Sequence, residues 1–359
     1  MYSYFHYVYI FISFFMCLIL TKFLINNAKF FNLLDHPNYR KFHKNSTPTV
    51  GGLAIVVTFF IIIFFSWLFE YHIIYLPLNE IYVLLMSTFI IVMTGLIDDI
   101  KGLSASNKFL FQIIAAIIIV LGISDFQLVE WPFSQYFESN FYNSLLTIFY
   151  IVSILNAINL IDGLDTLAGG VSIIITITFI VLCLLSGIAI NELYVLFILL
   201  GSLAAFLVYN KPPAKTFLGD SGSLFIGWLF AIISLSYAQK TAFSLSILIP
   251  IMALGIPSFD VIFVMLKRFN AKHNYKVKDR FKSILIPDNN HLHHLIILSG
   301  VSKRKTILLL YFLTFLTSMI ALYSYLQNIN LSYGIIFILL LIFIVRYLFL
   351  WKIKSRSNK

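Results

Sequence analysis

The chain has 359 residues, of which 60% are hydrophobic and only 11% are charged, and its formal net charge is +10. Soluble domains contain about 25% charged residues, so the composition excludes a soluble globular protein and predicts an integral membrane protein. The positive charge does not predict a nucleic-acid partner, because the basic residues lie in short segments between long apolar runs.

These apolar runs follow one another along the whole chain. A helix that crosses a bilayer needs about 20 apolar residues, and it must be helical because lipid offers its backbone no hydrogen-bond partner. We predict about eleven such helices, at residues 4–28, 50–69, 81–97, 109–123, 144–158, 167–187, 193–209, 223–238, 243–266, 306–325 and 332–351. The first run lacks a basic leader and a small-residue cleavage site, so we expect a retained span. Cys17 and Cys183 lie inside such runs and are expected to serve in packing.

The chain shows no internal repeat and no low-complexity linker, so the sequence predicts one all-α membrane domain over residues 1–359. Basic residues favour the cytoplasmic side of a membrane. When the segment after the first helix is placed in the cytoplasm, Lys240 is the one residue of 25 Lys and Arg that falls in an outer loop. The N-terminus is then outside and the C-terminus inside. The predicted cytoplasmic segments are residues 28–50, 98–108, 158–167, 210–223 and 267–305.

Acidic residues divide between the two sides in different ways. The acids of the predicted outer loops, among them Glu192, show no pattern and are interpreted as solvated residues. On the inner side, Asp98 and Asp99 are adjacent at the end of the third predicted helix, where a carboxylate opposes the helix dipole. Adjacent carboxylates repel each other unless a cation neutralises them. This pair predicts a Mg²⁺ or base site, with Lys101 or Lys108 facing phosphate; a solvated helix end is the alternative.

The next polar block lies between the fifth and sixth predicted helices. Asn156, Asn159 and Asp162 are spaced three residues apart and therefore share one face of a helix. Asp162, Gly163 and Asp165 follow in a short loop, where glycine allows a ligand to approach the backbone. This block predicts a site for a metal ion or a polar ligand rather than an ordinary Asn-capped turn.

A third block runs from Asn210 to Ser223. The following helix is expected to start near Ser223, which places Asp220 just before a positive helix terminus that can hold phosphate. Asp220 is therefore predicted to bind a metal; simple helix capping is compatible with that role. In the first loop, Arg40 to His43 add cations, and the segment from Thr47 to Gly52 predicts a tight turn before the second helix.

A fourth block contains Asp288, His291, His293 and His294. Neighbouring histidines on a loop rarely face one zinc ion, so we expect them to donate to phosphates. The basic residues between Lys267 and Lys282 are expected to lie on anionic lipid headgroups.

Together these blocks resemble the polyprenyl-phosphate N-acetylhexosamine-1-phosphate transferases, glycosyltransferase family 4. The resemblance extends from Arg40 to His294, with the blocks in the family's order. The matching residues are the Asp98–Asp99 pair, Asn156 to Asp165, Phe217 to Ser223, and His291 to His294. The family includes phospho-N-acetylmuramoyl-pentapeptide transferase and the enzymes that start O-antigen, enterobacterial common antigen and teichoic acid chains. The form of the histidine block is more similar to the second branch, which uses UDP-N-acetylglucosamine.

The resemblance implies a metal site and a set of catalytic residues. Asp220 is the expected principal ligand of Mg²⁺, with Asn159, Asp98 and Asp99 beside it; Mn²⁺ is the alternative ion. Asp98 or Asp99 would orient or deprotonate the lipid phosphate. Asp162 is also grouped with the catalytic residues.

The resemblance also implies how the substrates bind. Lys41 and Lys108 are expected to bind substrate, with Lys108 on phosphate. Asp165, Asn210 and Phe217 are expected to form the uridine pocket together with Asp162, with Phe217 stacked on uracil. The three histidines are expected to contact the diphosphate or the sugar, as further catalytic residues.

The implied reaction transfers a sugar-1-phosphate from a UDP-sugar to undecaprenyl phosphate and releases UMP. N-acetylglucosamine or a related N-acetylhexosamine is the expected sugar, in the first membrane step of lipopolysaccharide or other cell-surface polysaccharide synthesis and cell wall biogenesis. The segment 267–288 is longer than the family pattern, which leaves the sugar and the role of that segment open. The expected location is the inner (cytoplasmic) membrane, in contact with lipids and with the active site on the cytoplasmic side. A homodimer is left open.

Two other classes of protein compete with a transferase. A polytopic lipid or sugar transporter, or flippase, would need charged groups near the middle of the membrane. Here the mid-span regions are nearly free of charge and the acids gather at one face. A non-catalytic membrane scaffold would not need aspartates at four separate positions on one side.

Overall fold

The computed structural model describes residues 7–35, 46–69, 77–123, 140–187, 190–240 and 292–327, together with Phe343 and Tyr347. Nine helices in these ranges are long and apolar enough to cross a membrane. They are α1 (Val8–Asn27), α2 (Gly51–Leu68), α3 (Leu78–Lys101), α4 (Ala105–Gly122), α5 (Asn140–Ile161), α6 (Leu167–Ser186), α7 (Ile190–Asn210), α8 (Gly219–Lys240) and α13 (Lys303–Leu326). A short helix, α12 (Leu292–Leu298), precedes α13, and two two-residue strands, β1 (Leu34–Asp35) and β2 (Thr47–Pro48), pair antiparallel.

The prediction of an all-α polytopic membrane protein is confirmed by these helices. Each of the nine coincides with a predicted span. The predicted spans 243–266 and 332–351 lie outside the described residues, apart from Phe343 and Tyr347. The total of eleven, the orientation with the N-terminus outside, and the single domain over residues 1–359 therefore stay predictions.

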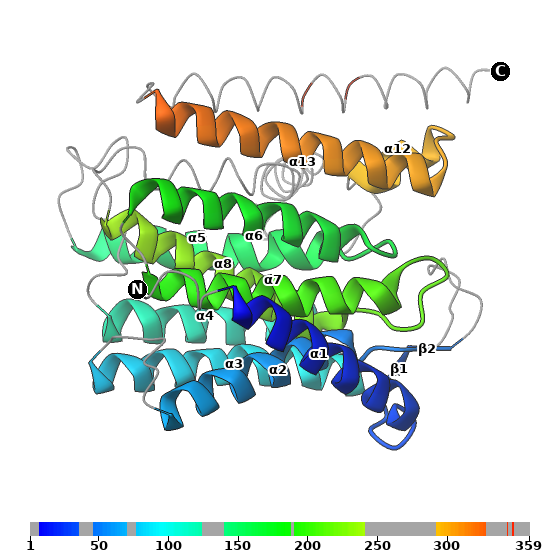
Figure 1. Ribbon diagram of the computed structural model, residues 1–359, viewed down its shortest axis with the longest axis horizontal. Coiled ribbons are helices and arrows are strands. Elements are labelled where there is room, and N and C mark those ends of the chain that lie inside the picture. Colours follow the sequence, from blue (N-terminus) through cyan, green and yellow to red (C-terminus); the bar gives the residue numbers. More distant parts are fainter. Residues whose placement is uncertain are drawn as a thin grey trace, which may run out of the picture.

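The helices lie side by side in one bundle, with α8 near its centre and α13 along one edge (Figure 1). α8 packs against α2, α3 and α5, while α7 packs against α1 and α6, and α13 packs on α6. Buried residues make up 83% of the membrane-crossing part of α8 but only 22% of that of α1. The last residues of the third sequence block, from Gly219 on, form the beginning of α8, which is the most buried of the nine described helices.

Glycines allow the closest helix contacts in the bundle. Gly52 of α2 faces Gly222 of α8, and a Cβ atom on either residue would overlap the backbone of the other. Gly95 of α3 lies in the same way against the backbone of Asp220 and Ser221. The beginning of α8 is therefore held directly against the backbones of two neighbouring helices, without side chains between them.

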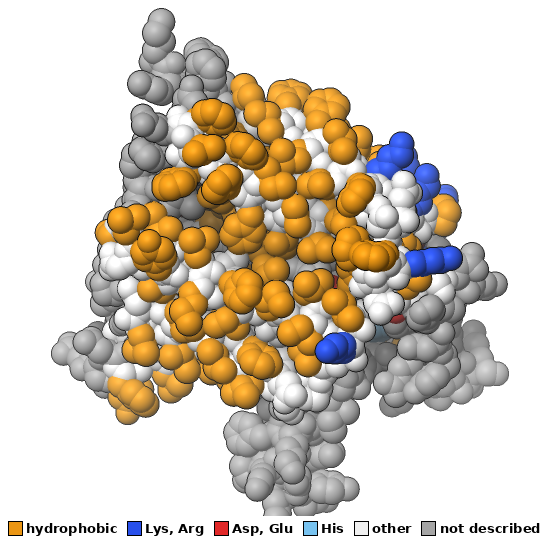
Figure 2. All heavy atoms as spheres, turned by 90° about the horizontal axis from the view of Figure 1, so that it is seen from below, with side chains coloured by type: hydrophobic (Ala, Val, Ile, Leu, Met, Phe, Trp, Pro, Cys, Tyr) orange, Lys and Arg blue, Asp and Glu red, His pale blue; other side chains and the backbone are white. Residues whose placement is uncertain are grey.

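The outer surface matches a lipid environment. Figure 2 shows a face covered mainly by hydrophobic side chains, with the visible Lys and Arg side chains gathered toward one side. Phe11 and Ile19 of α1, Trp67 of α2 and Phe89 of α3 are all exposed. Such a broad exposed apolar surface is unusual for a soluble protein but suits hydrocarbon chains.

One outer acid was interpreted wrongly from the sequence. Glu192, in the first turn of α7, is buried, and its carboxylate accepts a hydrogen bond from the Ser236 hydroxyl of α8. The side chain therefore connects two helices instead of pointing into water. The single acid among apolar residues gave no sign of that partner, which lies 44 residues further along the chain.

Candidate functional site

Lys108 joins three helices at one end of the bundle. Its ammonium group donates to Asp98 Oδ2 of α3 at 2.9 Å and forms an ion pair with Asp220 Oδ2 of α8. Asp98 also accepts the backbone N–H of Leu103 at 2.7 Å through Oδ1. The lysine lies in the first turn of α4, whose N-terminus is capped by the Ser104 hydroxyl. The sequence expectation that a cation neutralises the aspartate pair is met for Asp98 by this lysine.

Asp99 points to a different partner from its neighbour. Its two carboxylate oxygens accept the backbone N–H groups of Asp220 and Ser221 at 2.8 and 3.0 Å. These donors belong to the first turn of α8 and have no partner within their own helix. Asp99 therefore caps α8 from α3. Gly219, with φ +72°, leaves the room for this carboxylate, since a Cβ atom there would lie 2.7 Å from Asp99 Oδ2.

The start of α8 differs from the sequence expectation. The helix begins at Gly219 rather than near Ser223, so Asp220 lies inside its first turn and not ahead of it. The cap from Asp99 explains the difference, because a carboxylate from another helix stabilises four additional helical residues. The side chain of Asp220 keeps its predicted place beside the aspartate pair through their shared lysine.

Asparagines of α5 extend the polar cluster toward the membrane interior. Asn159 donates through Nδ2 to the Ser223 hydroxyl of α8 at 2.9 Å, so its carbonyl oxygen is the atom suited to a cation. Asn156, one turn earlier, donates to Gln112 Oε1 of α4 at 2.7 Å. Gln112 is fully buried and lies one turn after Lys108. The predicted shared face of Asn156 and Asn159 thus connects α5 to two helices that bear the charged groups.

Asp162 lies in the loop that follows α5, where the charges of other aspartates act on its carboxyl group. Burial, and then the negative charges of Asp220, Asp99 and Asp165, raise the pKa of Asp162 from 3.8 to about 8. The acids of three separate sequence blocks are therefore close enough to influence one another. Such a concentration of negative charge is unfavourable by itself and favours a bound cation.

Asp165 and Asn210 organise the loop between α5 and α6. Asp165 accepts the backbone N–H of Ala214 at 3.3 Å. Asn210 is buried at the end of α7, where it accepts the backbone N–H of Thr166 at 2.6 Å and donates to the backbone carbonyl of Thr216 at 2.8 Å. Asn210 thus binds backbone groups of two loops with its own amide. The uridine-pocket roles of Asp165 and Asn210 stay predictions.

Thr166, which follows Asp165, has an unusual backbone conformation. Its φ of +68° and ψ of −14° are left-handed, a conformation that costs an L residue other than glycine about 1–2 kcal/mol. Within the described residues, Asn32 is the only other non-glycine residue with positive φ. Leu167 begins α6 directly after this turn, so the left-handed residue sets the angle at which the acidic loop meets the helix.

Phe217 lies at the junction with the first loop. Its backbone N–H donates to the carbonyl of Pro48 at 2.8 Å, and its carbonyl accepts the N–H of Gly51 at 3.0 Å. The Phe217 side chain is half-buried, and its stacking on uracil stays a prediction. The tight turn expected between Thr47 and Gly52 is wrong, because Thr47 and Pro48 form β2 and α2 begins at Gly51. The N–H groups of Gly51 and Gly52 bind the 217–218 backbone. Lys41 lies outside the described residues.

The histidine block reaches the same end of the bundle. His293, on α12, is buried against Gly163, where a Cβ atom would lie 2.7 Å from His293 Nε2. The rings of His293 and His294 are 4.2 Å apart. His291 and Asp288 lie outside the described residues. Four separate sequence blocks thus meet at one end of the bundle, as the sequence predicted; their individual catalytic roles stay predictions.

The donor atoms at this end suit Mg²⁺ by their chemistry. Carboxylate and amide oxygens are the ligands that Mg²⁺ prefers, and Asp220, Asn159, Asp98 and Asp99 supply them. Within the described part of the chain, however, no three His, Cys, Asp or Glu side chains are arranged to hold a metal ion. Lys108 lies between two of the predicted ligands, and backbone N–H groups bind a third. The ion therefore stays a proposal.

Sequence reasoning missed two residues that contact this site. Gln112 is the partner of Asn156, and Tyr311 of α13 donates its hydroxyl to the backbone carbonyl of Thr166. A polar residue one turn after Lys108 in an apolar run is a signal that could have identified Gln112. Tyr311 is one of 20 tyrosines in the chain and gave no comparable signal.

Comparison with known proteins agrees with this arrangement. The family model described as glycosyl transferase family 4 matches residues 81–238, which include the blocks from Asp98 to Ser223. A relative named probable undecaprenyl-phosphate N-acetylglucosaminyl 1-phosphate transferase, from Bacillus subtilis, is 36% identical over 92% of this chain and 88% of its own length. The decaprenyl-phosphate N-acetylglucosaminephosphotransferase of Mycobacterium leprae is 30% identical over 77% of this chain and 73% of its own.

The phospho-N-acetylmuramoyl-pentapeptide transferase branch of the family is also represented. The phospho-N-acetylmuramoyl-pentapeptide-transferase of Staphylococcus epidermidis is 31% identical over 78% of this chain and 85% of its own length. The Bacillus subtilis relative is more similar and matches more of the chain, as the form of the histidine block predicted. With a match of this extent, the chain belongs to glycosyl transferase family 4.

Proposed function

We propose that this protein transfers N-acetylglucosamine-1-phosphate from its UDP-sugar to a polyprenyl phosphate, with release of UMP. The names of the Bacillus subtilis and Mycobacterium leprae relatives support this reaction class and an isoprenoid acceptor. The transporter alternative finds no support among these relatives. Undecaprenyl phosphate is the acceptor named for the Bacillus subtilis relative, and we propose it here.

One structural observation is central to the proposal. Lys108 binds Asp98 and Asp220 from two other helices, while Asp162 is close enough to Asp220 and Asp99 for their charges to raise its pKa. Several carboxylates beside one lysine at the end of a membrane bundle are suited to holding a divalent cation, which together with the lysine would bring two phosphate-containing substrates together. A lysine in this setting can exchange its carboxylate partners for a phosphate oxygen.

The reaction joins two anions, and this chain's residues must reduce their repulsion. A phosphate oxygen of the lipid attacks the phosphorus bonded to the sugar, and the bond to UMP breaks. Lys108 would bind a phosphate oxygen, and Asp98 or Asp99 would orient the acceptor. Mg²⁺, held by Asp220 and Asn159 with Asp98 and Asp99 nearby, would neutralise the donor diphosphate.

The location of the site follows from the same chemistry. A nucleotide sugar is made in the cytosol and the acceptor phosphate lies at the headgroup plane, so we propose that the site faces the cytoplasm from the inner membrane. The orientation deduced from the basic residues supports this side. The product would then start a cell-surface polysaccharide on the cytoplasmic leaflet.

A test in detergent separates a transferase from a transporter, since no compartments exist there. The purified full-length protein is incubated with undecaprenyl phosphate, MgCl₂ and a series of UDP-sugars, and UMP and lipid-linked sugar are measured. We expect UMP with UDP-N-acetylglucosamine, in equal amount to the lipid product. Omission of the lipid is the control for simple hydrolysis. A lack of UMP with every sugar would contradict the proposal.

A further inference from the structure

The left-handed turn at Thr166 is held on both sides by other helices. Its backbone N–H donates to Asn210 Oδ1 of α7 at 2.6 Å. Its carbonyl accepts the Tyr311 hydroxyl of α13 at 2.5 Å and the Gly170 N–H at 2.8 Å. The strained residue therefore has both of its backbone polar groups bound by side chains from elsewhere in the fold. A strained conformation persists only where surrounding contacts determine it in this way.

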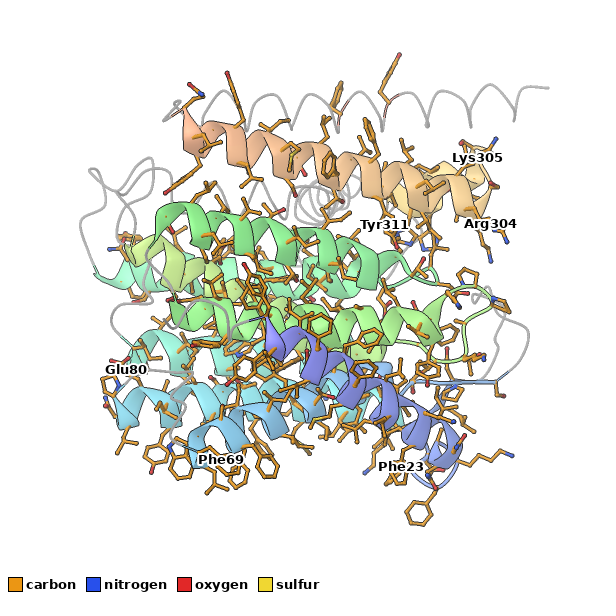
Figure 3. All side chains as sticks on the ribbon, in the orientation of Figure 1. Phe23, Phe69, Glu80, Arg304, Lys305 and Tyr311 are labelled. Carbon is orange, nitrogen blue, oxygen red and sulfur yellow. The ribbon has the colours of Figure 1, made fainter. Side chains whose placement is uncertain are left out.

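The contact with Tyr311 is closely fitted. Tyr311 lies on the side of α13 that faces α6 (Figure 3). Gly170, one turn into α6, provides the space, because a Cβ atom at this position would overlap the Tyr311 hydroxyl and ring. Any larger residue at 170 would therefore push the tyrosine away from Thr166. Tyr311 and Gly170 fit each other as a pair, from helices that are 141 positions apart in the sequence.

The turn controls the direction of the acidic loop. Asp165 directly precedes Thr166 and is bound to Ala214 on its other side. Gly163, two residues earlier, lies against His293. The segment from Asp162 to Thr166 thus touches α7, the loop after α7, α12 and α13, and Tyr311 provides the contact from α13. A change at Tyr311 would be transmitted to the two carboxylates through the backbone of Thr166.

We propose that Tyr311 is a positioning residue for the nucleotide-sugar, acting through its hydrogen bond to the Thr166 carbonyl, which fixes the loop that bears Asp162 and Asp165. This inference rests on the proposed function and on the predicted place of Asp162 and Asp165 in the uridine pocket of the donor. In the proposed function, Asp98 or Asp99 of α3 orients the acceptor, and Asp98 is bound by Lys108 of α4 rather than by a residue of this turn. Loss of the Tyr311 hydroxyl therefore affects the donor more than the acceptor.

Tyr311→Phe tests this separation because it keeps the ring and removes only the hydroxyl. Rates of UMP release are measured against UDP-N-acetylglucosamine and against undecaprenyl phosphate in turn. We expect the KM for the UDP-sugar to rise about tenfold, the size of one hydrogen bond, and the KM for the lipid to change less than about twofold. Tyr150→Phe is the matched control, since Tyr150 is buried and its hydroxyl pairs with Ser234 in the middle of the bundle.

A second variant distinguishes positioning from general loosening of the fold. Glycine adopts the left-handed conformation without steric cost, so Thr166→Gly should keep the turn with less dependence on the hydrogen bonds from Asn210 and Tyr311. We expect Thr166→Gly combined with Tyr311→Phe to recover at least half of the lost affinity for the UDP-sugar. A role of Tyr311 in stability alone predicts no such recovery.

Direct binding of UDP-N-acetylglucosamine, measured by calorimetry, decides the inference independently of turnover. If Tyr311→Phe binds the nucleotide-sugar as the unaltered protein does, the positioning role is wrong, whether or not UMP is released. Equal increases of both KM values would also overturn it, while the proposed function would stand. If the unaltered protein binds the nucleotide-sugar but forms no product with any acceptor, the proposed function fails, and weaker binding by Tyr311→Phe still supports the positioning role.

Discussion

The helices of the bundle are joined by polar contacts at two levels, and these differ in kind. In the middle of the bundle, Trp228 donates to the Thr88 hydroxyl at 2.9 Å, and Tyr150 pairs with Ser234 at 2.7 Å. Each of these is a neutral pair, and the Ser234 hydroxyl also donates to the backbone carbonyl of Ala231 at 2.7 Å. At the site end, Lys108 contacts carboxylates from two helices, and the acids there influence one another.

The difference indicates which contacts serve the fold and which serve a ligand. A neutral hydrogen bond between membrane helices contributes about 0.6 kcal/mol on average, and it needs nothing else. Several carboxylates around one lysine are costly to bury, since their charges exceed that of their partner. The site end is therefore an unfavourable arrangement that a bound cation would relieve, and three changes test this contrast.

The largest effect is expected from Asp220→Asn, which removes a charge from the site end while keeping the shape. UMP release should fall by about 10²–10³-fold, which is the size of losing one electrostatic group that stabilises a transition state. The measurement is UMP release over a series of MgCl₂ concentrations, with EDTA as the metal-free reference. Expression and thermal stability should stay close to those of the unaltered protein. Turnover within about threefold of normal would remove Asp220 from the site.

A smaller loss of turnover is expected from Gln112→Leu, because Gln112 lies between the site end and the middle of the bundle. The change removes one of two acceptors of the Asn156 amide, which also donates to the Val152 carbonyl at 2.8 Å. We expect this to cost about 1 kcal/mol and to loosen α4 against α5. We expect a lower melting temperature in detergent and a several-fold slower UMP release, since α4 bears Lys108 and α5 bears Asn159. Tyr150→Phe is the control and should lower stability slightly with unchanged turnover.

A double-mutant cycle sharpens this second test. If Gln112 and Asn156 act through each other, Gln112→Leu combined with Asn156→Leu should cost less than the sum of the two single changes. Fully additive costs would show that the pair is not a functional unit. Equal effects of Gln112→Leu and Tyr150→Phe on turnover would contradict the difference in role between contacts near the site end and contacts in the middle of the bundle.

The smallest effect concerns pH. Because the pKa of Asp162 is raised from 3.8 to about 8, the folded protein without metal keeps a proton there between about pH 4 and 8 that the unfolded chain releases. This group's contribution to the free energy of unfolding should therefore decrease as the pH rises through that range. We expect the melting temperature of the metal-free protein to fall more between pH 5.5 and 8.5 than that of Asp162→Asn. Parallel curves for the two proteins would contradict the raised pKa.

Much of this architecture could be predicted from the sequence. A long apolar run in lipid must be helical, because only a helix satisfies all backbone hydrogen bonds within one segment. All nine described spans were therefore predicted. The blocks around Asp98, Asp162 and Asp220 stood out because carboxylates are rare beside such runs. Their meeting at one end followed from alternation of the helices across the membrane.

The contacts between these residues could not be predicted, because they depend on helix packing. Asp98 and Asp99 are adjacent in sequence, yet one binds Lys108 and the other caps α8. Nothing local distinguishes them, since the difference arises from their directions on α3. Glu192 was interpreted wrongly for the same reason, as its partner Ser236 comes from α8.

The contact of α3 with α8 bears on how such transferases can be recombined. The first turn of α8 takes its cap from Asp99, and Gly95 and Gly219 leave no space for a side chain at the junction. A chimera that takes only α8 from a relative would pack a different helix surface against α3, without the close fit at Gly95 that α3 provides here. Exchange of α3 and α8 together would preserve both this close fit and the cap from the α3 carboxylate. Engineers who exchange helices between these enzymes should therefore transfer α3 and α8 together.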